Sequence, residues 1–267
     1  MAEKKWNVLS RRRQAYLPWI TTPVILILIV VAWRMYIAEF GISPLILPKP
    51  GAVWHAWIEM LQSPRAWFHT YMTAYETLVG FVIGAAVGVG LGILVGRFRW
   101  LEMTLNPFLI ATQVIPKVAF IPLFVLWFGF GATSKIIVAA VLAFFPIMTN
   151  TLLGIRSIDP GHRDVMTSLN ASTGAIFRRL EIPSAMPYIL TGMEVGIVLS
   201  IIGAVVGEYL GGNEGLGYLL IARMSAFEPA GLFAVMLQLT ILGFLLFLTI
   251  GVFRKLLIPW HHSTNIN

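Results

Sequence analysis

Apart from Arg34, which lies near the outer end of the first stretch and can reach the interface, four ionisable side chains stand within the long apolar stretches of this sequence, namely Glu76, Lys117, Glu194 and Glu208. A charge inside an apolar segment is costly unless it faces protein or water, so we predict that these residues line a path for a solute. Other roles are open. Glu76 and Glu194 could pair or reach the interface near the ends of their stretches. Lys117 could bond a carbonyl that a neighbouring proline leaves free, and Glu208 could pack against another helix.

The same residues form no recognisable catalytic set. Glu194 and Glu208 would lie about 21 Å apart along a straight helix, too far for a carboxylate dyad. The chain has no cysteine, which excludes disulfides and thiol chemistry. His261 and His262 alone do not make a metal site, and the glycine-rich segment 207–217 lacks the Gly-Lys-Ser/Thr of a phosphate-binding loop. The sequence therefore argues against an intramembrane enzyme, which is the alternative from another class.

A polar, amphipathic insert separates two of the apolar stretches, at residues 156–186. Within it, residues 164–169 predict one short helix, and Ser172 or Thr173 is the N-cap candidate of a second short helix over 175–180. An ordered element of this kind between membrane segments is typical of a surface that a partner grips. A simple channel, which is a further alternative, has no use for such an insert.

The composition excludes an ordinary soluble domain. Of the 267 residues, 58% are hydrophobic and 12% are charged, whereas soluble domains carry about 25% charged residues. The net charge of +7 is typical of a membrane protein with Lys and Arg on its cytoplasmic side. No basic and aromatic motif points to nucleic acid.

Six stretches have the roughly 20 mostly apolar residues that a membrane-spanning helix needs. They cover residues 17–38, 74–96, 107–128, 135–155, 187–210 and 231–253. The first follows a basic start and has no small-residue cleavage site, so we expect an uncleaved helix rather than a signal peptide.

The distribution of Lys and Arg predicts the orientation of these spans. Most of them fall on the proposed cytoplasmic segments, and only Lys49, Arg65, Lys135 and Arg223 fall on the proposed outside segments. This asymmetry favours an even number of spans with both termini in the cytoplasm. The predicted organisation is a basic cytoplasmic segment over 1–16, a membrane domain over 17–255 and a cytoplasmic tail over 256–267.

Glycine stands at every fourth position of the second span, at Gly80, Gly84, Gly88, Gly92 and Gly96. Such a ridge lets another membrane helix approach closely. We favour packing within the chain, and the alternative is an interface between subunits.

Two further segments have unusual composition. The third span contains Pro107, Pro116 and Pro122, which predicts a broken helix that lines a path or forms a pivot. The outside segment 39–73 contains a predicted short helix over 52–61. Its tryptophans suit the membrane interface, with a docking surface as the alternative.

The insert resembles the cytoplasmic motif of permease subunits of binding-protein-dependent ABC importers. That motif reads Glu-Ala-Ala, three residues, Gly, nine residues, Ile-x-Leu-Pro. Here Asp164-Val-Met166 stands at Glu-Ala-Ala, Asn170 at the glycine and Leu180-Glu-Ile-Pro183 at Ile-x-Leu-Pro. The spacing is intact although several identities differ, and Asn is one of the few residues that tolerate the left-handed backbone.

Other segments resemble the nitrate, sulfonate, taurine and bicarbonate branch of these permeases, which includes permeases for thiamine-precursor pyrimidines and riboflavin-like nutrients. They are residues 47–50, 121–129, 143–147, 187–192 and 215–218. The likeness runs from about residue 20 to 255. It implies an all-α polytopic protein of the bacterial inner membrane with the type I ABC importer permease fold.

The resemblance also implies partners. A periplasmic or lipid-anchored solute-binding protein would deliver the solute, and a pair of ATPase subunits would supply ATP hydrolysis. ATP and Mg²⁺ would then belong to the ATPase, with no cofactor in this chain. A second permease copy and membrane lipids complete the set; a homodimer is expected rather than a heterodimer because no second permease half is fused here.

The insert corresponds to the coupling helix of that family, which sits in a cleft of the ATPase. The residues expected to couple to the ATPase are Asp164, Leu169, Asn170, Ala171, Ser172, Ile176, Phe177, Arg178, Ile182 and Pro183.

The solute is predicted from charge. Glu76 and Glu194 stand where the anion-transporting members of the family carry arginine, and a carboxylate on the path would repel an anion. This favours a neutral or cationic nutrient, such as a pyrimidine or vitamin precursor. A sulfonate, taurine or nitrate importer is the alternative.

Overall fold

The computed structural model describes residues 2–259, with the side chains of residues 20–112 and 114–259, and this part of the chain contains helices and no strand. The α-helices are α1 (Ala2–Phe40), α2 (Pro50–Gln62), α3 (Pro64–Arg97), α4 (Arg99–Val114), α5 (Ile121–Phe128), α6 (Ala132–Arg156), α7 (Pro160–Ser168), α8 (Thr173–Ile176), α9 (Ile182–Gly211), α10 (Leu216–Ser225) and α11 (Pro229–Leu257). His261 and His262 of the predicted tail lie outside the described residues.

Among the described residues, five helices are long and apolar enough to cross a membrane. They are Ile20–Phe40 within α1, α3, α6, the continuous helix Thr173–Gly211 that includes α8 and α9, and α11. The pair α4 and α5 passes the same test as one span with a bend of 82°. Counted this way, the predicted six spans are present.

The third span is broken, as the proline pattern predicts, but at only one of its three prolines. Pro107 lies inside α4 and Pro122 lies in the first turn of α5, and neither interrupts its helix. The break comes at Ile115, which is extended (φ −70°, ψ 126°) and precedes Pro116. Proline disfavours helical backbone in the residue before it and cannot donate its own hydrogen bond, which explains why the chain turns at this point.

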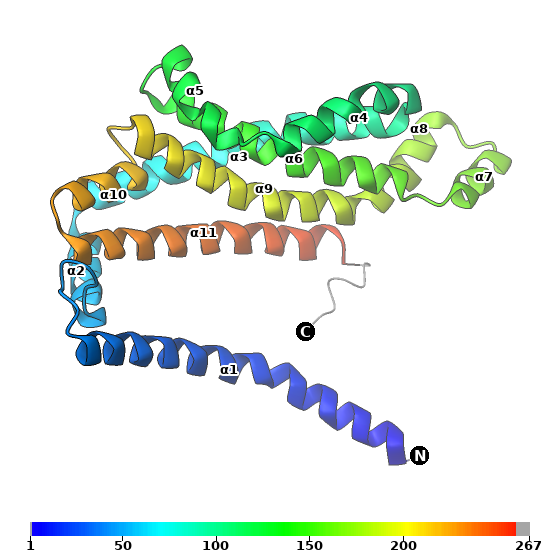
Figure 1. Cartoon of the computed structure of the whole chain (residues 1–267). Coiled ribbons are helices and arrows are strands. Elements are labelled where there is room, and N and C mark those ends of the chain that lie inside the picture. Colours follow the sequence, from blue (N-terminus) through cyan, green and yellow to red (C-terminus); the bar gives the residue numbers. More distant parts are fainter. Residues whose placement is uncertain (1, 260–267) are drawn as a thin grey trace.

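The centre of the molecule is formed by α3, α6 and α9. Helix α6 lies between the other two and contacts both along its length. Phe81, Ala85, Ala143, Ile147 and Ile197 from the three helices form a buried apolar core. Helix α11 packs against α9, α10 and α2, whereas α1 lies apart from the bundle (Figure 1).

The glycine ridge of α3 faces α6. A Cβ atom on Gly84 would lie 2.5 Å from the backbone oxygen of Ala140, and one on Gly92 would lie 2.6 Å from the Cβ atom of Thr151. A third, on Gly80, would lie 2.5 Å from the Cβ atom of Ala139. Gly88 and Gly96 meet α6 in the same way. The ridge therefore serves close helix packing within the chain.

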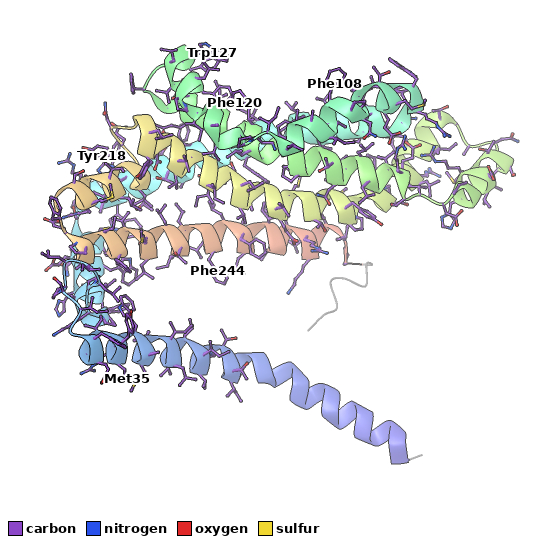
Figure 2. All side chains as sticks on the ribbon, in the orientation of Figure 1. Met35, Phe108, Phe120, Trp127, Tyr218 and Phe244 are labelled. Atoms are coloured by element: carbon purple, nitrogen blue, oxygen red, sulfur yellow. The ribbon has the colours of Figure 1, made fainter. Side chains whose placement is uncertain are left out.

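The outer surface of the bundle is apolar. Met35, Phe108, Trp127 and Phe244, which Figure 2 labels on four different helices, are 66%, 67%, 63% and 59% exposed. Aliphatic and aromatic side chains at such exposure suit a hydrocarbon surrounding rather than water. The N-terminal end of α1 and the C-terminal end of α11 lie at the same end of the molecule as α7 and α8 (Figure 1). This arrangement matches the predicted orientation, in which the insert and both chain ends share the cytoplasmic side.

Candidate functional site

The cytoplasmic insert projects from one end of the bundle as α7 and α8 (Figure 1). Asp159 caps α7, because its carboxylate accepts a hydrogen bond from the Gly161 N–H at 2.8 Å. Ser172 is the N-cap of α8 and accepts from the Ala175 N–H at 3.3 Å. Capping of this kind satisfies backbone donors that a helix start leaves free. Of the two N-cap candidates predicted for the second helix, the structure uses Ser172.

Asn170 closes α7 with left-handed backbone, at φ 55°. The N–H of Ala171 donates to the Met166 carbonyl at 3.0 Å, and the N–H of Asn170 donates to the Thr167 carbonyl at 2.9 Å. This is the usual way to end a helix when glycine or asparagine occupies the left-handed position. Asn170 therefore adopts, at the position of the motif's glycine, the left-handed backbone that glycine favours.

The second half of the insert differs from the prediction. Instead of a separate short helix over 175–180, α8 continues through a π-helical turn at Phe177–Glu181 into α9 without a break. Pro183 does not end the helix but lies in the first turn of α9. Because proline has no N–H to donate to the preceding turn, a local widening of the helix at this point is physically expected. The first half also begins earlier, since α7 starts at Pro160.

The tip of the insert is exposed and partly apolar. Val165 is 58% exposed and Leu169 is 73% exposed, and no residue of α7 is buried. Of the other predicted coupling residues, Asp164, Asn170, Ser172 and Arg178 are exposed, and Ala171, Ile176, Phe177, Ile182 and Pro183 are partly buried. Exposed apolar side chains on a polar element at the cytoplasmic end are typical of a contact surface for another protein.

Glu181 is a residue of the insert that the sequence reasoning missed. Its side chain is 4% exposed and forms ion pairs with Arg97 and Arg163. One feature of the sequence could have identified Glu181, because it is a lone acid between two apolar residues, Leu180 and Ile182, in a basic part of the chain.

The second group of candidate residues forms a buried polar cluster between α3, α6 and α9. Glu76 is 0% exposed, and its Oε1 atom lies 3.4 Å from Nζ of Lys135, which is itself 3% exposed. Glu208 is 1% exposed and accepts hydrogen bonds from the Thr73 hydroxyl and the Gly217 N–H, both at 2.6 Å. A solute could reach these carboxylates only if the three helices moved apart.

Lys135 corrects one part of the charge assignment. The prediction placed it on an outside loop, but the structure places it inside α6 and pairs it with Glu76. Its burial is possible because the opposite charge compensates the loss of hydration. The orientation is unaffected, since Lys135 was one of the few basic residues assigned to the outside.

Glu208 also fixes the glycine-rich segment that follows α9. Leu216 N–H donates to the Thr73 hydroxyl oxygen at 2.8 Å, and Gly215 N–H donates to His69 Nδ1 at 3.1 Å. Gly215 has φ 99°, and a Cβ atom there would lie 2.1 Å from the Glu208 carboxylate. The loop therefore folds tightly over α3 and needs glycine where it meets this side chain.

The remaining two candidates lie apart from this cluster. Glu194 on α9 forms an ion pair with Arg254 on α11 at 2.9 Å. Lys117 lies in the bend between α4 and α5, with Nζ 4.7 Å from the centre of the Phe145 ring. A role of Glu76, Lys117, Glu194 and Glu208 on a solute path stays a prediction, and the three carboxylates already have partners within the chain.

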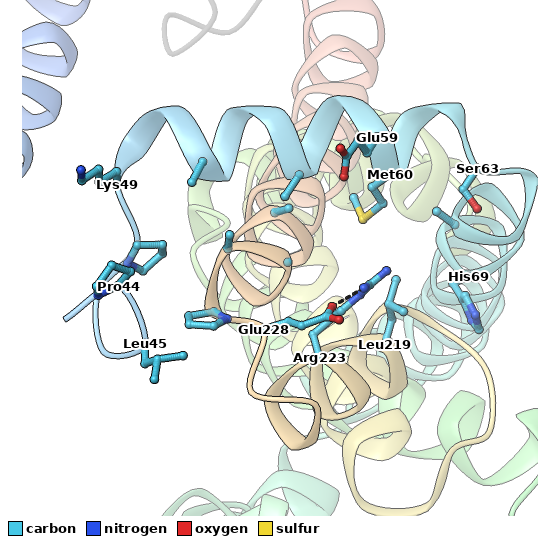
Figure 3. A pocket seen from close by; sticks show the side chains of 18 of the residues that line it. Pro44, Leu45, Lys49, Glu59, Met60, Ser63, His69, Leu219, Arg223 and Glu228 are labelled. Atoms are coloured by element: carbon cyan, nitrogen blue, oxygen red, sulfur yellow. Dashed lines mark hydrogen bonds and ion pairs between the residues drawn. The ribbon is translucent and has the colours of Figure 1, made fainter.

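A cavity of about 760 Å³ opens at the opposite end of the molecule from the insert. It lies between α2, the start of α3, α10 and the start of α11, and Figure 3 shows Glu59, Met60 and Leu219 along its wall. The ion pair between Arg223 and Glu228 lies at its side. Its size would accommodate a small organic molecule.

These features define a multi-pass membrane transport subunit: an apolar helical bundle, an ordered insert at the cytoplasmic end and a cavity at the outer end. The chain belongs to the family described as "Binding-protein-dependent transport system inner membrane component", which matches residues 88–261. The predicted family is thereby confirmed.

Three relatives cover most of this chain. It is 37% identical to the formylaminopyrimidine transport permease protein ThiX of Halalkalibacterium halodurans, over 88% of this chain and 93% of the relative. It is 36% identical to the riboflavin transport system permease protein RibX of Chloroflexus aurantiacus, over 92% of each chain. It is 29% identical to the putative aliphatic sulfonates transport permease protein SsuC of Bacillus subtilis, over 95% of this chain and 91% of the relative.

The fold is also found in a solved structure. An inward-facing structure of the MetNI methionine ABC transporter superposes with a TM-score of 0.62 at 18% identity, over 72% of this chain and 97% of the other. The chain is thus an inner-membrane permease subunit of an ABC importer that works with an ATPase and a solute-binding protein. It is not itself an enzyme, because ATP hydrolysis takes place in the partner subunit.

Proposed function

We propose that this permease imports a small neutral or cationic nitrogenous nutrient and is driven through the insert at residues 164–183. The observation that carries the coupling role is the exposed apolar tip of the insert, formed by Val165 in α7 and by Leu169 directly after it. Val165 and Leu169 present an apolar surface beside the capped turn at Asn170. A groove on the ATPase can bury such a surface, in the same way that other proteins bind the apolar face of a short helix.

The substrate proposal rests on the relatives rather than on the two glutamates. Glu76 pairs with Lys135 and Glu194 pairs with Arg254, so neither contributes an unpaired negative charge. The higher identities, 37% and 36%, are to permeases named for a formylaminopyrimidine and for riboflavin, and the lower one, 29%, is to a permease named for sulfonates. A nitrogen heterocycle is therefore favoured over an anion such as a sulfonate, taurine or nitrate.

The working assembly that we propose contains two copies of this chain, two ATPase subunits and one receptor. ATP and Mg²⁺ would be held by the ATPase subunits. The receptor would dock at the end opposite the insert, where the cavity near Glu59 and Arg223 opens. The apolar surfaces of α1, α4 and α5 would be covered by lipid or by the second copy.

The test of coupling is the substitution Leu169→Asp in the complex with the cognate ATPase, reconstituted in lipid vesicles. Placing a charge in an apolar contact should lower ATPase binding and solute uptake by about tenfold or more. Leu256→Asp is the matched control, because Leu256 is 70% exposed at the same end of the molecule. Equal uptake by Leu169→Asp and the parent protein would exclude the docking role.

The solute is tested on the purified cognate receptor and on uptake by the same vesicles. We expect a formylaminopyrimidine or a flavin to bind the receptor and to compete for uptake. Receptor binding to taurine or nitrate, without affinity for nitrogen heterocycles, would contradict the substrate proposal and leave the coupling proposal intact.

A further inference from the structure

Glu181 joins three parts of the molecule at the cytoplasmic end. It ends the π-helical turn before α9, and its Oε1 atom lies 3.2 Å from Nη2 of Arg163 on α7. Its Oε2 atom lies 3.2 Å from Nε of Arg97, the last residue of α3. The side chain of Glu181 is 4% exposed, whereas those of Arg97 and Arg163 are 30% and 41% exposed. A buried carboxylate is thus held by two partly exposed arginines from different helices.

Helix α7 has little else that attaches it to the bundle. None of its residues is buried, and it has no extensive contact with any other described helix. Among the residues that the structure describes, the ion pair from Arg163 to Glu181 is therefore the charged contact that joins α7 to the bundle. Arg97 reinforces the other side, since its guanidinium carbon also lies 4.9 Å from the centre of the Phe177 ring, one turn before Glu181.

We propose that Glu181 is a positioning residue for energy coupling, which makes α7 move together with α3 and α9 when the ATPase displaces the insert. This rests on the proposed coupling role of the insert. Separating a buried carboxylate from its cations would leave the charge uncompensated, which is strongly unfavourable. A push on α7 is therefore passed through Arg163 and Glu181 to α9, and through Arg97 to α3. Without the ion pair, the chain segments on either side of α7 would absorb the movement.

The experiment uses Arg163→Gln, Glu181→Gln and the double variant in the full importer with cognate ATPase and receptor. The measured quantity is solute transported per ATP hydrolysed. We expect both single variants to lower this ratio by about tenfold, within the range typical of coupling between distant sites. ATPase subunits should still co-purify, because the apolar tip at Val165 and Leu169 is unchanged. The double variant should be no worse than Glu181→Gln, because that single variant already lacks both ion pairs of the carboxylate.

Arg99→Gln is the matched control, because Arg99 is an exposed arginine two residues from Arg97. It should keep the parent ratio. Arg163→Gln keeps the test decisive even if Glu181→Gln reduces folding, since the Arg163 side chain is 41% exposed. A parent-like ratio in Arg163→Gln, or effects that add in the double variant, would overturn the proposal. Failure of the docking role itself would appear separately, as normal ATPase binding and uptake in Leu169→Asp.

Discussion

At the scale of single residues, two of the three candidate carboxylates inside the membrane domain are compensated by cationic side chains of the same chain, whereas Glu208 accepts hydrogen bonds from the Thr73 hydroxyl and the Gly217 N–H. Lys135 neutralises Glu76, and Arg254 neutralises Glu194. The sequence identified the acidic members of these pairs because they interrupt apolar stretches. It could not identify the partners, because Lys135 stands near a span end and the pairing joins residues 59 and 60 positions apart.

The pair between Glu76 and Lys135 gives a prediction of stability. Lys135→Met should destabilise the protein by roughly 3–5 kcal/mol, because it leaves a fully buried carboxylate without its cation. The double variant Glu76→Gln with Lys135→Met should recover most of this loss. Thermal unfolding in detergent measures both, and Lys255→Met, which changes an exposed lysine, is the control. A parent-like unfolding temperature in Lys135→Met would show that the pair contributes little.

At the scale of helices, periodicity and proline gave most of the elements but not their ends. The sequence predicted the spans within α3, α6, α9 and α11, yet α3 begins about ten residues earlier than the apolar run, at Pro64. The first turns of α3 carry polar residues such as His69 and Thr73, which hold the glycine-rich loop. Such contacts come from another part of the chain and leave no local signal. The sequence did not predict that α8 continues into α9 for a different reason, because a proline such as Pro183 usually indicates the end of a helix.

The contact between α3 and α6 gives a prediction at the same scale. Gly84→Leu should cost about 1–3 kcal/mol or more, because its side chain would meet a backbone carbonyl that cannot move away. Gly90→Leu is the matched control on the same helix, since a Cβ atom there meets nothing within 4 Å. Thermal stability and the yield of folded protein measure the difference. Equal behaviour of the two variants would mean that the helices separate easily.

At the scale of the whole molecule, the six spans place the insert and the chain ends together. The absence of cysteine from the sequence makes this directly measurable. We expect Ser225→Cys, at the end of α10, to react with a membrane-impermeant thiol reagent in cells whose outer envelope is permeable. Ser168→Cys, in the insert, should react only after the inner membrane is opened. Labelling of Ser168→Cys in sealed cells would reverse the orientation.

Helix α1 has a consequence for how the protein is made. It contacts the rest of the chain near its outer end, through α2 and through Trp33, whose ring centre lies 5.6 Å from that of Phe233. Only 6% of the 18-residue apolar stretch within Ile20–Phe40 is buried inside the molecule. Helix α1 is synthesised before α2 to α11 and must remain in lipid until they arrive, which an independently stable apolar span can do. Of the five long apolar helices among the described residues, α1 is thus the one that depends least on those that follow it.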